Sequence, residues 1–418
     1  MKKTLLTICL VWMCFSLSAQ KIIDLSGKWS FSIDRQDNGE KEKWFSHTLN
    51  DFINLPGSMP EKLKGDEVTA KTQWTGSLYD SSYYYNPYME KYRKEGNIKF
   101  PFFLTPDKHY VGAAWYQKEV NIPADWKGER ILLFLERPHI ETTVWVNGQK
   151  TGMQNSLCVP HQYDITRYVR PGKCTITIRV DNRIKEINVG PDSHSITDQT
   201  QGNWNGIVGR ICLQTTPKTY FDDIQIYPEP EQKLARVKVV IKGTGTAKVK
   251  LSAESFNTDK KHIVPAIQQE IKLNKGVTET EMVLPMGNDM LLWDEFHPAL
   301  YKLKAEVTNG KKTEIKEIQF GMRRFEIKGK WFYVNGRKTQ LRGTVENCDF
   351  PLTGYAPMDV ESWERVFRIC RSYGLNHMRF HSFCPPEAAF MAADRVGFYL
   401  QPEGPSWPNH GPKLGLGQ

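Results

Sequence analysis

The 418-residue sequence lacks a long apolar segment after its first 20 residues. A helix needs about 20 consecutive apolar residues to cross a bilayer, so we predict no membrane span in the mature chain. Blocks of like charge are also missing, because 56 basic and 47 acidic residues are interspersed along the chain. The net charge of +9 is therefore weak evidence for nucleic acid, and we expect no such partner.

Closely paired cysteines are missing too. Two of the eight cysteines lie in the N-terminal segment, and the others are widely spaced: Cys158, Cys174, Cys212, Cys348, Cys370 and Cys384. This spacing shows no metal framework of the zinc-finger kind. A cysteine can also serve as a small buried hydrophobe, so the pattern leaves disulfide pairing open.

The bulk composition is that of a folded, multidomain protein. Hydrophobic residues make up 39% of the chain and charged residues 25%, which excludes disorder. A chain of this length exceeds one ordinary domain, so we expect two or three.

The N-terminus has the layout of a secretory signal peptide over residues 1–20. Lys2 and Lys3 precede an apolar run from Leu5 to Phe15, and small residues ending at Ala19 follow. A membrane anchor is the alternative, but the run is too short to span a bilayer. We therefore predict export to the periplasm or the extracellular space.

Residues 24–219 contain short alternating or β-branched runs separated by Gly, Pro, Asn and Asp, which are typical of strands. Examples are Lys28–Ile33, Arg130–Leu135, Thr142–Val146 and Thr175–Val180. Asn147-Gly148 follows one of these runs and predicts a hairpin turn, because both turn positions need positive φ. The region is predicted to be an all-β sandwich.

Residues 72–103 are rich in aromatic side chains without a period of two or 3.6. The stretch contains Trp74, Tyr79, Tyr83, Tyr84, Tyr85, Tyr88, Tyr92, Phe100, Phe102 and Phe103. We interpret it as a long ordered loop, and such loops are often functional. Its rings either stack on sugar faces or cover the sandwich or a domain interface.

Residues 220–322 are predicted to form a second, smaller sandwich with one charged face, because Lys alternates with apolar residues there, as in Val237–Ile241. After Arg323 the pattern changes again. A hairpin at 331–336 leads to a strand ending at Gly343, a helix capped by Asp359 and closed by Gly374, and a strand over 375–380. A second helix over 386–396 and a strand over 398–401 complete a βαβαβ pattern, so a parallel sheet begins here.

Several short motifs in this order resemble glycoside hydrolase family 2, the β-galactosidase, β-glucuronidase and β-mannosidase group. They are Leu25–Trp29, Leu55–Ser58, Ala114–Tyr116, Val144–Gly148, Tyr163–Thr166, Trp204–Ile207, Leu292-Trp293 with Pro298, Leu300 and Tyr301, and Phe320–Arg323. Each motif alone is weak, but their succession is specific.

The resemblance implies three domains after the signal: a sugar-binding jelly-roll sandwich (21–219), an immunoglobulin-like sandwich (220–322) and the first part of a (β/α)8 TIM barrel (323–418). It also implies retaining hydrolysis with two glutamates. Both follow later barrel strands in the family, so we expect the acid/base and the nucleophile beyond Gln418 and predict no catalytic residue within these 418 residues.

The same resemblance places a group of residues in the front wall of the pocket. The predicted substrate-binding residues are Asn347, Arg379, His381, Glu403, Trp407 and His410. Arg379 can fork two hydrogen bonds to hydroxyls or a carboxylate, and Trp407 can stack on a ring. Two alternatives stay open: Arg379 and Glu403 simply pair with each other, or His410 is exposed to solvent. The family's metal-ligand loop is altered at Val345–Pro351, so we predict no metal and no cofactor.

Three functions remain open on this evidence. The first is an exo-acting β-glycosidase represented by its N-terminal part. The second is a non-catalytic carbohydrate-binding chain or pseudo-enzyme, and the third is an inactive gene fragment. The expected partner is an oligo- or polysaccharide in each of the first two cases.

Overall fold

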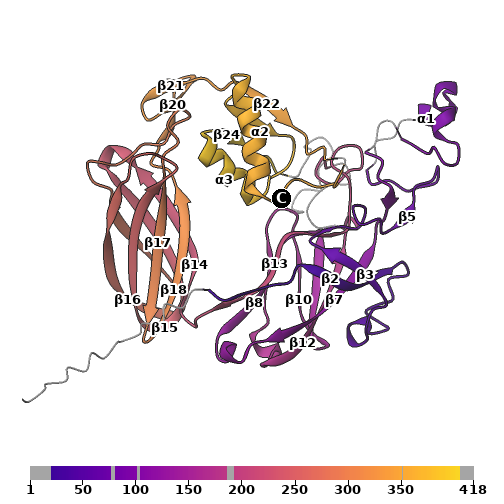
Figure 1. The fold of residues 1–418 in the computed structure, drawn as a ribbon, viewed down its shortest axis with the longest axis horizontal. Helices are drawn as coiled ribbons and strands as arrows, with labels where there is room; N and C mark the ends of the chain where they lie inside the picture. Colours follow the sequence, from indigo (N-terminus) through magenta and orange to yellow (C-terminus); the bar gives the residue numbers. More distant parts are fainter. Residues whose placement is uncertain (1–19, 77–80, 101–103, 186–192, 351, 405–418) are drawn as a thin grey trace, which may run out of the picture.

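The fold was analysed in a computed structural model that describes residues 20–76, 81–100, 104–185, 193–350 and 352–404. The described chain is mostly β, with two sandwiches side by side and a small helical unit above them (Figure 1). Separate groups of buried apolar side chains fill the three parts. None of the helices in these ranges is long and apolar enough to cross a membrane. The predicted signal segment lies outside the described residues, apart from Gln20.

The first sandwich has two sheets that enclose one core. One sheet has the order β1 (Ile22–Asp24), β13 (Gly206–Thr216), β8 (Arg130–His139) and β11 (His161–Asp164), with β4 (Gly57–Ser58) beside β13. The other has the order β10 (Gln149–Asn155), β9 (Glu141–Val146), β12 (Gly172–Asp181), β7 (Ala113–Ile122), β2 (Gly27–Asp34) and β3 (Asp51–Leu55). Alternate residues of the strands, such as Leu133, Val144 and Ile178, are fully buried between the sheets. The predicted strands are therefore confirmed.

The predicted hairpin turn is also confirmed. Asn147 and Gly148 join β9 to β10 with φ of 50° and 76°. The Asn147 side chain accepts from the Thr175 backbone N–H at 2.9 Å, which ties the turn to β12. Short 3-10 turns connect other strands of the sandwich: η1 (Trp44–Ser46), η3 (Ala124–Trp126) and η4 (Thr166–Tyr168).

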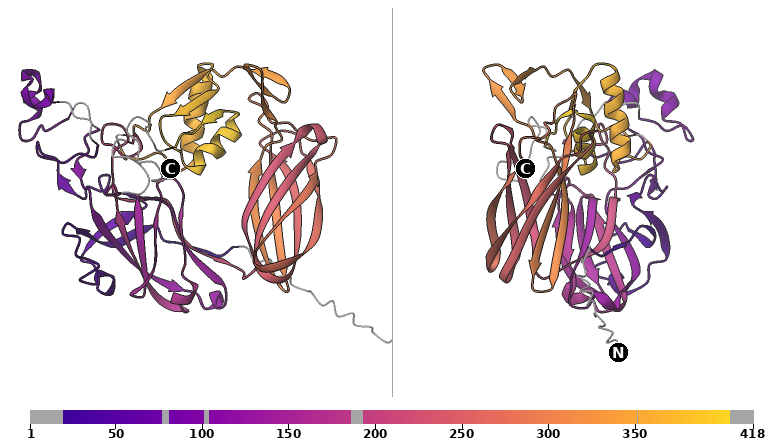
Figure 2. Two further views of the ribbon diagram at one scale, coloured as in Figure 1. Left: turned by 180° about the vertical axis from the view of Figure 1, so that it is seen from behind. Right: turned by 60° about the vertical axis from the view of Figure 1, so that its left-hand side comes forward.

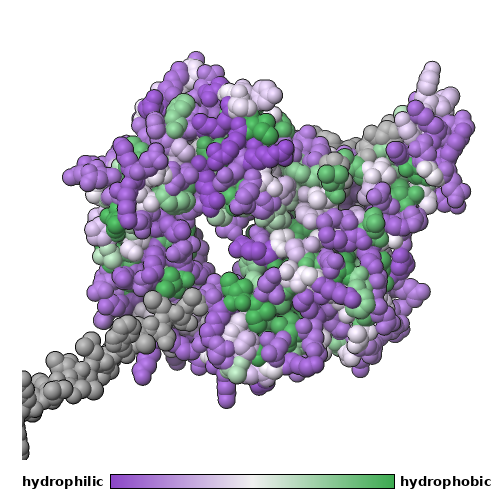
Figure 3. Space-filling view, viewed as in Figure 1, coloured by the Kyte–Doolittle hydropathy of each residue, from purple (hydrophilic) through white to green (hydrophobic). Residues whose placement is uncertain are grey.

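The described part of the aromatic stretch, residues 72–76 and 81–100, contains regular structure that a loop lacks. It contains α1 (Ser82–Tyr85) and η2 (Pro87–Tyr92), and a two-stranded ribbon of β5 (Asp66–Glu67) and β6 (Lys108–His109) closes its base. The unit made by residues 81–100, here called the arm, projects from the first sandwich (Figures 1 and 3). The sequence did not predict these short helices, because one or two helical turns are too short to show a hydrophobic periodicity.

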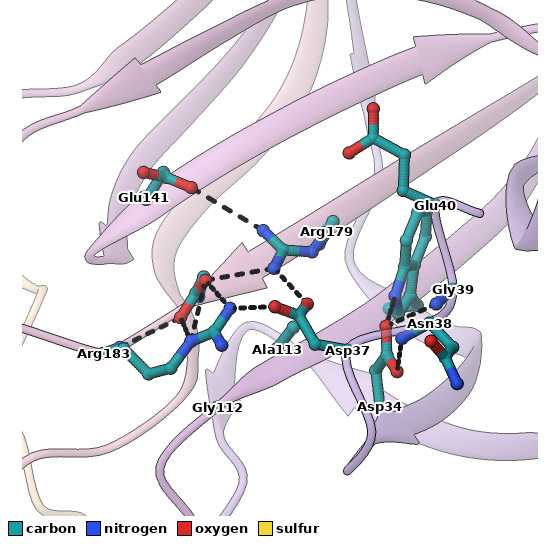
Figure 4. Close-up of polar contacts among 12 residues, drawn as sticks. Asp34, Asp37, Asn38, Gly39, Glu40, Gly112, Ala113, Glu141, Arg179 and Arg183 are labelled. Atoms are coloured by element: carbon teal, nitrogen blue, oxygen red, sulfur yellow. Dashed lines mark hydrogen bonds and ion pairs between the residues drawn. The ribbon is translucent and has the colours of Figure 1, made fainter. Parts of the chain in front are cut away.

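A network of partly buried charges ties the segment after β2 to the end of β12 (Figure 4). Arg179 donates to Asp37 at 2.7 Å and to Asp181 at 3.1 Å, and Arg183 bonds the same two carboxylates. Glu141 lies 3.6 Å from Arg179. Burial raises the pKa of Asp181, but the bonds from Arg183 and the other cations outweigh it and hold that pKa far below its usual range. The network is thus a paired structural element of the sandwich.

The second sandwich is built around two long, bent strands. Its strands are β14 (Tyr220–Glu229), β15 (Leu234–Phe256), β16 (Ile263–Pro285), β17 (Leu300–Asn309) and β18 (Lys312–Phe320), with η5 (Pro230–Gln232) between the first two. The first half of β15 pairs with β14 and the second half with β17, and a bulge at Gly243/Gly245 separates them. Because β15 bends, strands that are hydrogen-bonded in the continuous order β14, β15, β17 and β18 form both layers of the sandwich. Lysines occupy the outer face, which is mainly hydrophilic in Figure 3.

A hairpin and a parallel sheet follow. The small sheet of β19 (Phe325–Lys328), β20 (Trp331–Val334) and β21 (Arg337–Thr339) contains the predicted turn at Asn335-Gly336. The next strands, β22 (Gly343–Glu346), β23 (His377–Phe380) and β24 (Tyr399–Gln401), pair in parallel, and α2 (Val360–Ser372) and α3 (Glu387–Val396) connect them. This confirms the βαβαβ prediction.

The helix ends are those read from the sequence. The Asp359 carboxylate accepts from the Ser362 N–H at 2.8 Å, and Gly374 and Gly397 close the two helices at φ of 79° and 77°. One boundary was wrong: the strand predicted to end at Gly343 begins there. Pairing with β23 decides this register, and that long-range contact carries no local signal.

Candidate functional site

The carboxyl ends of β22, β23 and β24 lie at one edge of the parallel sheet, here called the mouth. In parallel α/β sheets, ligands bind outside this edge because the loops there are free to carry polar side chains. Glu346 ends β22, Arg379 and His381 lie at the end of β23, and Glu403 follows β24. The sheet register therefore brings residues that are up to 57 positions apart to the same edge.

Arg379 is the centre of the mouth. Its Nη2 donates to the Glu403 Oε2 at 3.1 Å, and its Nε donates to the other carboxylate oxygen. The same Nη2 also donates to Nδ1 of His381 at 2.8 Å, which needs an unprotonated Nδ1. The pairing of Arg379 with Glu403, left open by the sequence, is therefore present.

The Glu403 carboxyl is held in its charged form. Burial raises its pKa, but the hydrogen bonds from Arg379 and Ser382 and the nearby positive charge outweigh that effect and lower the pKa below its ordinary value. Glu403 is therefore an anion at neutral pH that holds the guanidinium in place.

The pKa of Glu346 is shifted in the opposite direction. Burial raises its pKa, the Cys348 N–H bonded to Oε1 at 2.7 Å lowers it, and the nearby Asp349 raises it further. The net shift is upward. Burial also raises the pKa of Asp349. A carboxyl with a raised pKa at a strand end is typical of functional sites.

The predicted residues divide into three groups. Arg379, His381 and Glu403 are brought together at the mouth. Asn347 is exposed in the segment after β22. Trp407 and His410 lie outside the described residues, so their predicted roles stay predictions.

The first sandwich contributes residues that the sequence analysis missed. Ser195 Oγ donates to the carbonyl of Ser382 at 2.6 Å, across a sequence separation of 187 residues. The His194 ring packs edge-on against His381 with centroids 4.7 Å apart, and Gln201 Nε2 donates to the His381 carbonyl at 3.5 Å. Burial, followed by the charges of His381 and Arg379, lowers the pKa of His194 although Glu403 opposes the shift. These residues lie in an irregular segment between β12 and β13. Such a segment has no helical or strand periodicity from which the direction of a side chain could be predicted.

Arg137 of β8 fixes the next part of the same loop. Its guanidinium donates to the carbonyl of Cys384 at 2.9 Å and to that of Pro385 at 3.3 Å. It also donates to the carbonyl of Cys158 at 3.2 Å. The segment 381–385, which carries His381, is thus bound to the first sandwich through most of its carbonyl groups.

A cleft of about 250 Å³ adjoins this interface. The first sandwich provides Trp204, Asp198 and Gln201 to its wall, and the segment after β22 provides Phe350 and Thr353. His109 and Asp198, whose Nε2 and Oδ2 atoms are 3.2 Å apart, also line it. The cleft is walled by both the sandwich and the parallel-sheet unit, which is where ligand sites often form.

Trp74, a candidate sugar-stacking residue, is partly buried and packs against its neighbours. Its ring lies edge-on to Phe100 and to His109, with centroids 4.9 Å apart in both pairs. It supports the base of the arm. In the described ranges, no group of three or more His, Cys, Asp or Glu side chains is arranged to hold a metal ion, and the absence of a metal stays a prediction.

Comparison with known families gives two consecutive matches. Residues 22–217 match the model described as glycosyl hydrolases family 2, sugar binding domain, and residues 219–323 match the model described as glycosyl hydrolases family 2. Together they follow the order expected from the motifs.

Curated relatives are similar over much of the chain. A β-galactosidase from Thermoanaerobacter pseudethanolicus is 24% identical over 75% of this chain and 42% of its own length. A β-glucuronidase from Paenibacillus borealis is 23% identical over 93% of this chain and 59% of its own length. The chain thus spans about two fifths to three fifths of these relatives.

Solved structures show the same fold. The crystal structure of Ruminococcus gnavus β-glucuronidase matches with a TM-score of 0.68 and 20% sequence identity. The match covers 92% of this chain and 59% of that chain. At this identity the likeness concerns the fold alone.

Proposed function

Because this chain belongs to glycosyl hydrolases family 2, we propose that it is the N-terminal part of a retaining, exo-acting β-glycosidase of the β-galactosidase or β-glucuronidase kind. The observation that carries the proposal is the cluster of Arg379, His381 and Glu403 at the mouth of the parallel sheet. Relatives with both printed activities support the class of reaction.

The proposed architecture has three domains after a signal peptide at residues 1–20. Residues 21–219 form a jelly-roll sugar-binding domain, residues 220–322 an immunoglobulin-like domain, and residues 323–418 the start of a (β/α)8 barrel. The parallel order of β22, β23 and β24 supports the barrel, since α2 follows β22 and α3 follows β23. Export of the chain is part of the proposal, and N-terminal sequencing of the secreted protein would show the loss of residues 1–20.

The chemistry of the proposed reaction needs two carboxyl groups about 5–5.5 Å apart. One protonates the leaving oxygen and the other attacks the anomeric carbon. In the proposal both come from strands after β24. The residues of this chain bind and orient the sugar: Arg379 donates to a hydroxyl or a carboxylate, and His381 donates from Nε2. Glu403 is a positioning residue that holds Arg379.

Expression of the 418-residue chain and of a version extended by the downstream coding sequence tests the proposal. We expect the extended protein to contain an Asn-Glu pair after the fourth strand and to release nitrophenol from a β-galactoside or a β-glucuronide. The 418-residue chain should release none. Turnover by the short chain, or a stop codon directly after Gln418, would contradict the proposal.

A non-catalytic carbohydrate-binding chain is the second candidate. The observation that favours it is the Arg379 guanidinium, which is bonded to Glu403 and His381 at the mouth and can bind a sugar hydroxyl or carboxylate without any catalysis. Calorimetric titration with galactose and glucuronic acid tests this function in the 418-residue chain. Binding that disappears in Arg379→Ala would support it, and heats equal to those of dilution would exclude it.

A further inference from the structure

The arm carries three tyrosines that are exposed to different extents. Tyr84, Tyr85 and Tyr88 are 46%, 71% and 85% exposed. Soluble proteins rarely leave several large rings exposed together without a use for them. The hydroxyl at the tip of each ring makes tyrosine suitable for a wet contact, in which an apolar face and hydrogen-bonding groups meet the ligand together.

These rings stand on an ordered base. Tyr83, between them and the sandwich, is fully buried and stacks on Phe100 with centroids 4.4 Å apart. Its hydroxyl donates to the carbonyl of Tyr92 at 2.9 Å, and Arg93 donates to the carbonyl of Tyr83. Asn86 caps η2 by accepting from the Tyr88 N–H at 2.9 Å. The tyrosines are therefore presented by a folded support, which lowers the entropy lost when a ligand binds.

Two clefts at the stem of the arm share one wall. A cleft of about 980 Å³ at the stem of the arm is lined by Arg93, Lys99 and Phe100, and by the segment 105–107. The same segment lines the cleft of about 250 Å³ beside Trp204 and Gln201. Gln201 in turn contacts the His381 carbonyl at the mouth. The arrow of β22 points toward the side on which the arm stands, and the view from behind agrees (Figures 1 and 2).

We propose that the arm is a binding site for an extended glycan, whose sugar rings stack on Tyr85 and Tyr88 while the chain passes through the two clefts toward the mouth. Pyranose rings present an apolar C–H face and an edge of hydroxyls, which matches exposed tyrosines beside a polar cleft. The ligand is thus a polysaccharide rather than a short glycoside. The inference rests on the proposed carbohydrate function but requires no hydrolysis by this chain.

Affinity electrophoresis of the 418-residue protein tests the site. The gels contain a soluble β-galactan, a β-glucan or a polygalacturonate. We expect at least one to retard the wild-type protein, and the double variant Tyr85→Ala/Tyr88→Ala to bind that polysaccharide at least tenfold more weakly. Tyr373→Ala is the matched control, because Tyr373 is 82% exposed at the end of α2, away from the arm. It should be retarded like the wild type.

Three results would overturn the proposal. The first is no retardation by any of the three polysaccharides, and the second is equal retardation of the wild type and the double variant. The third is a wild-type dimer that dissociates in the double variant during sedimentation, which would assign the arm to a second copy of the chain. Thermal unfolding should be unchanged in the double variant, since both rings are exposed. Arg379→Ala separates this proposal from the proposed sugar site at the mouth. If Arg379→Ala loses binding and the double tyrosine variant does not, the glycan binds at the mouth and the arm takes no part.

Discussion

At the scale of single residues, the strongest constraints in this protein come from buried charges. Asp181 is fully buried, and Arg179 and Arg183 both donate to its carboxylate. Lys185 lies 3.0 Å from the same carboxylate. A buried pair of this kind adds little against an apolar replacement, but the loss of one partner leaves the other charges uncompensated.

Asp181→Asn should therefore lower the free energy of unfolding by about 3 kcal/mol, because three cations lose their shared anion. Urea unfolding followed by tryptophan fluorescence measures the change. Asp125→Asn is the control, since it removes an exposed ion pair with Lys21 and should leave the midpoint unchanged. Equal midpoints for both variants would show that the network is not needed for stability.

Buried histidines predict how stability depends on pH. His161 lies between Thr142, whose Oγ1 is 2.6 Å from Nδ1, and the Ser156 carbonyl, which is 3.2 Å from Nε2. Burial lowers its pKa to about 4 although the bond to Ser156 opposes the shift. The unfolded chain binds a proton near pH 6.5 and the folded chain only near pH 4, so stability must fall as the pH falls between these values.

His161→Gln should reduce this acid sensitivity, because glutamine keeps an N–H for Ser156 and has no proton to gain. Between pH 7 and pH 5 the wild type should lose about 1–2 kcal/mol more stability than the variant. Chemical unfolding at several pH values measures the slope. His297→Gln, at an exposed position, should keep the wild-type slope. Parallel slopes for wild type and His161→Gln would contradict the assignment.

At the scale of elements, the loop after β23 is shaped by the first sandwich. Ser195, Gln201 and Arg137 bind four of its carbonyl groups, those of His381, Ser382, Cys384 and Pro385. Phe383 of the same loop is buried in the core under α2 and α3, so the four bonds and this packing together hold its conformation.

Arg137→Met should free the loop while the sheets remain intact, because methionine fills space but donates no hydrogen bond. We expect faster amide hydrogen exchange in peptides covering residues 381–386, with unchanged exchange in β12. Arg210→Met is the control, because Arg210 is exposed and bonds Glu136 and Glu387 without touching the loop carbonyls. Unchanged exchange in Arg137→Met would show that the loop is held by other contacts.

At the scale of the whole molecule, the cores differ in how complete they are. The core of the second sandwich is formed entirely by residues 221–322. The core under α2 and α3 rests on a sheet of three strands, and Val345 of β22 is half-exposed. A small sheet with open edges is marginal by itself.

The isolated fragment 220–322 should therefore unfold cooperatively in urea, whereas the fragment 323–418 should show no cooperative transition. Circular dichroism of the two purified fragments measures this difference. A cooperative transition in the second fragment would show that β22, β23 and β24 form an independent unit.

The sequence alone determined the features that depend on near neighbours. The turn at Asn147-Gly148, the cap at Asp359 and the helix end at Gly397 were all predicted, because each follows from the conformational preference of one or two residues. The order of β and α elements and the family were read in the same way, from short motifs along the chain.

Only the tertiary structure decided what the mouth and the arm are made of. The sequence placed Arg379 and Glu403 at strand ends, but their pairing depends on the register of three parallel strands. His194 and Ser195 reach the mouth from a sandwich loop, and Tyr83 becomes the buried base of exposed rings. These contacts join residues that are far apart in the chain. They form only when whole elements pack together, and the entropy lost in closing such long loops leaves no pattern in the local sequence.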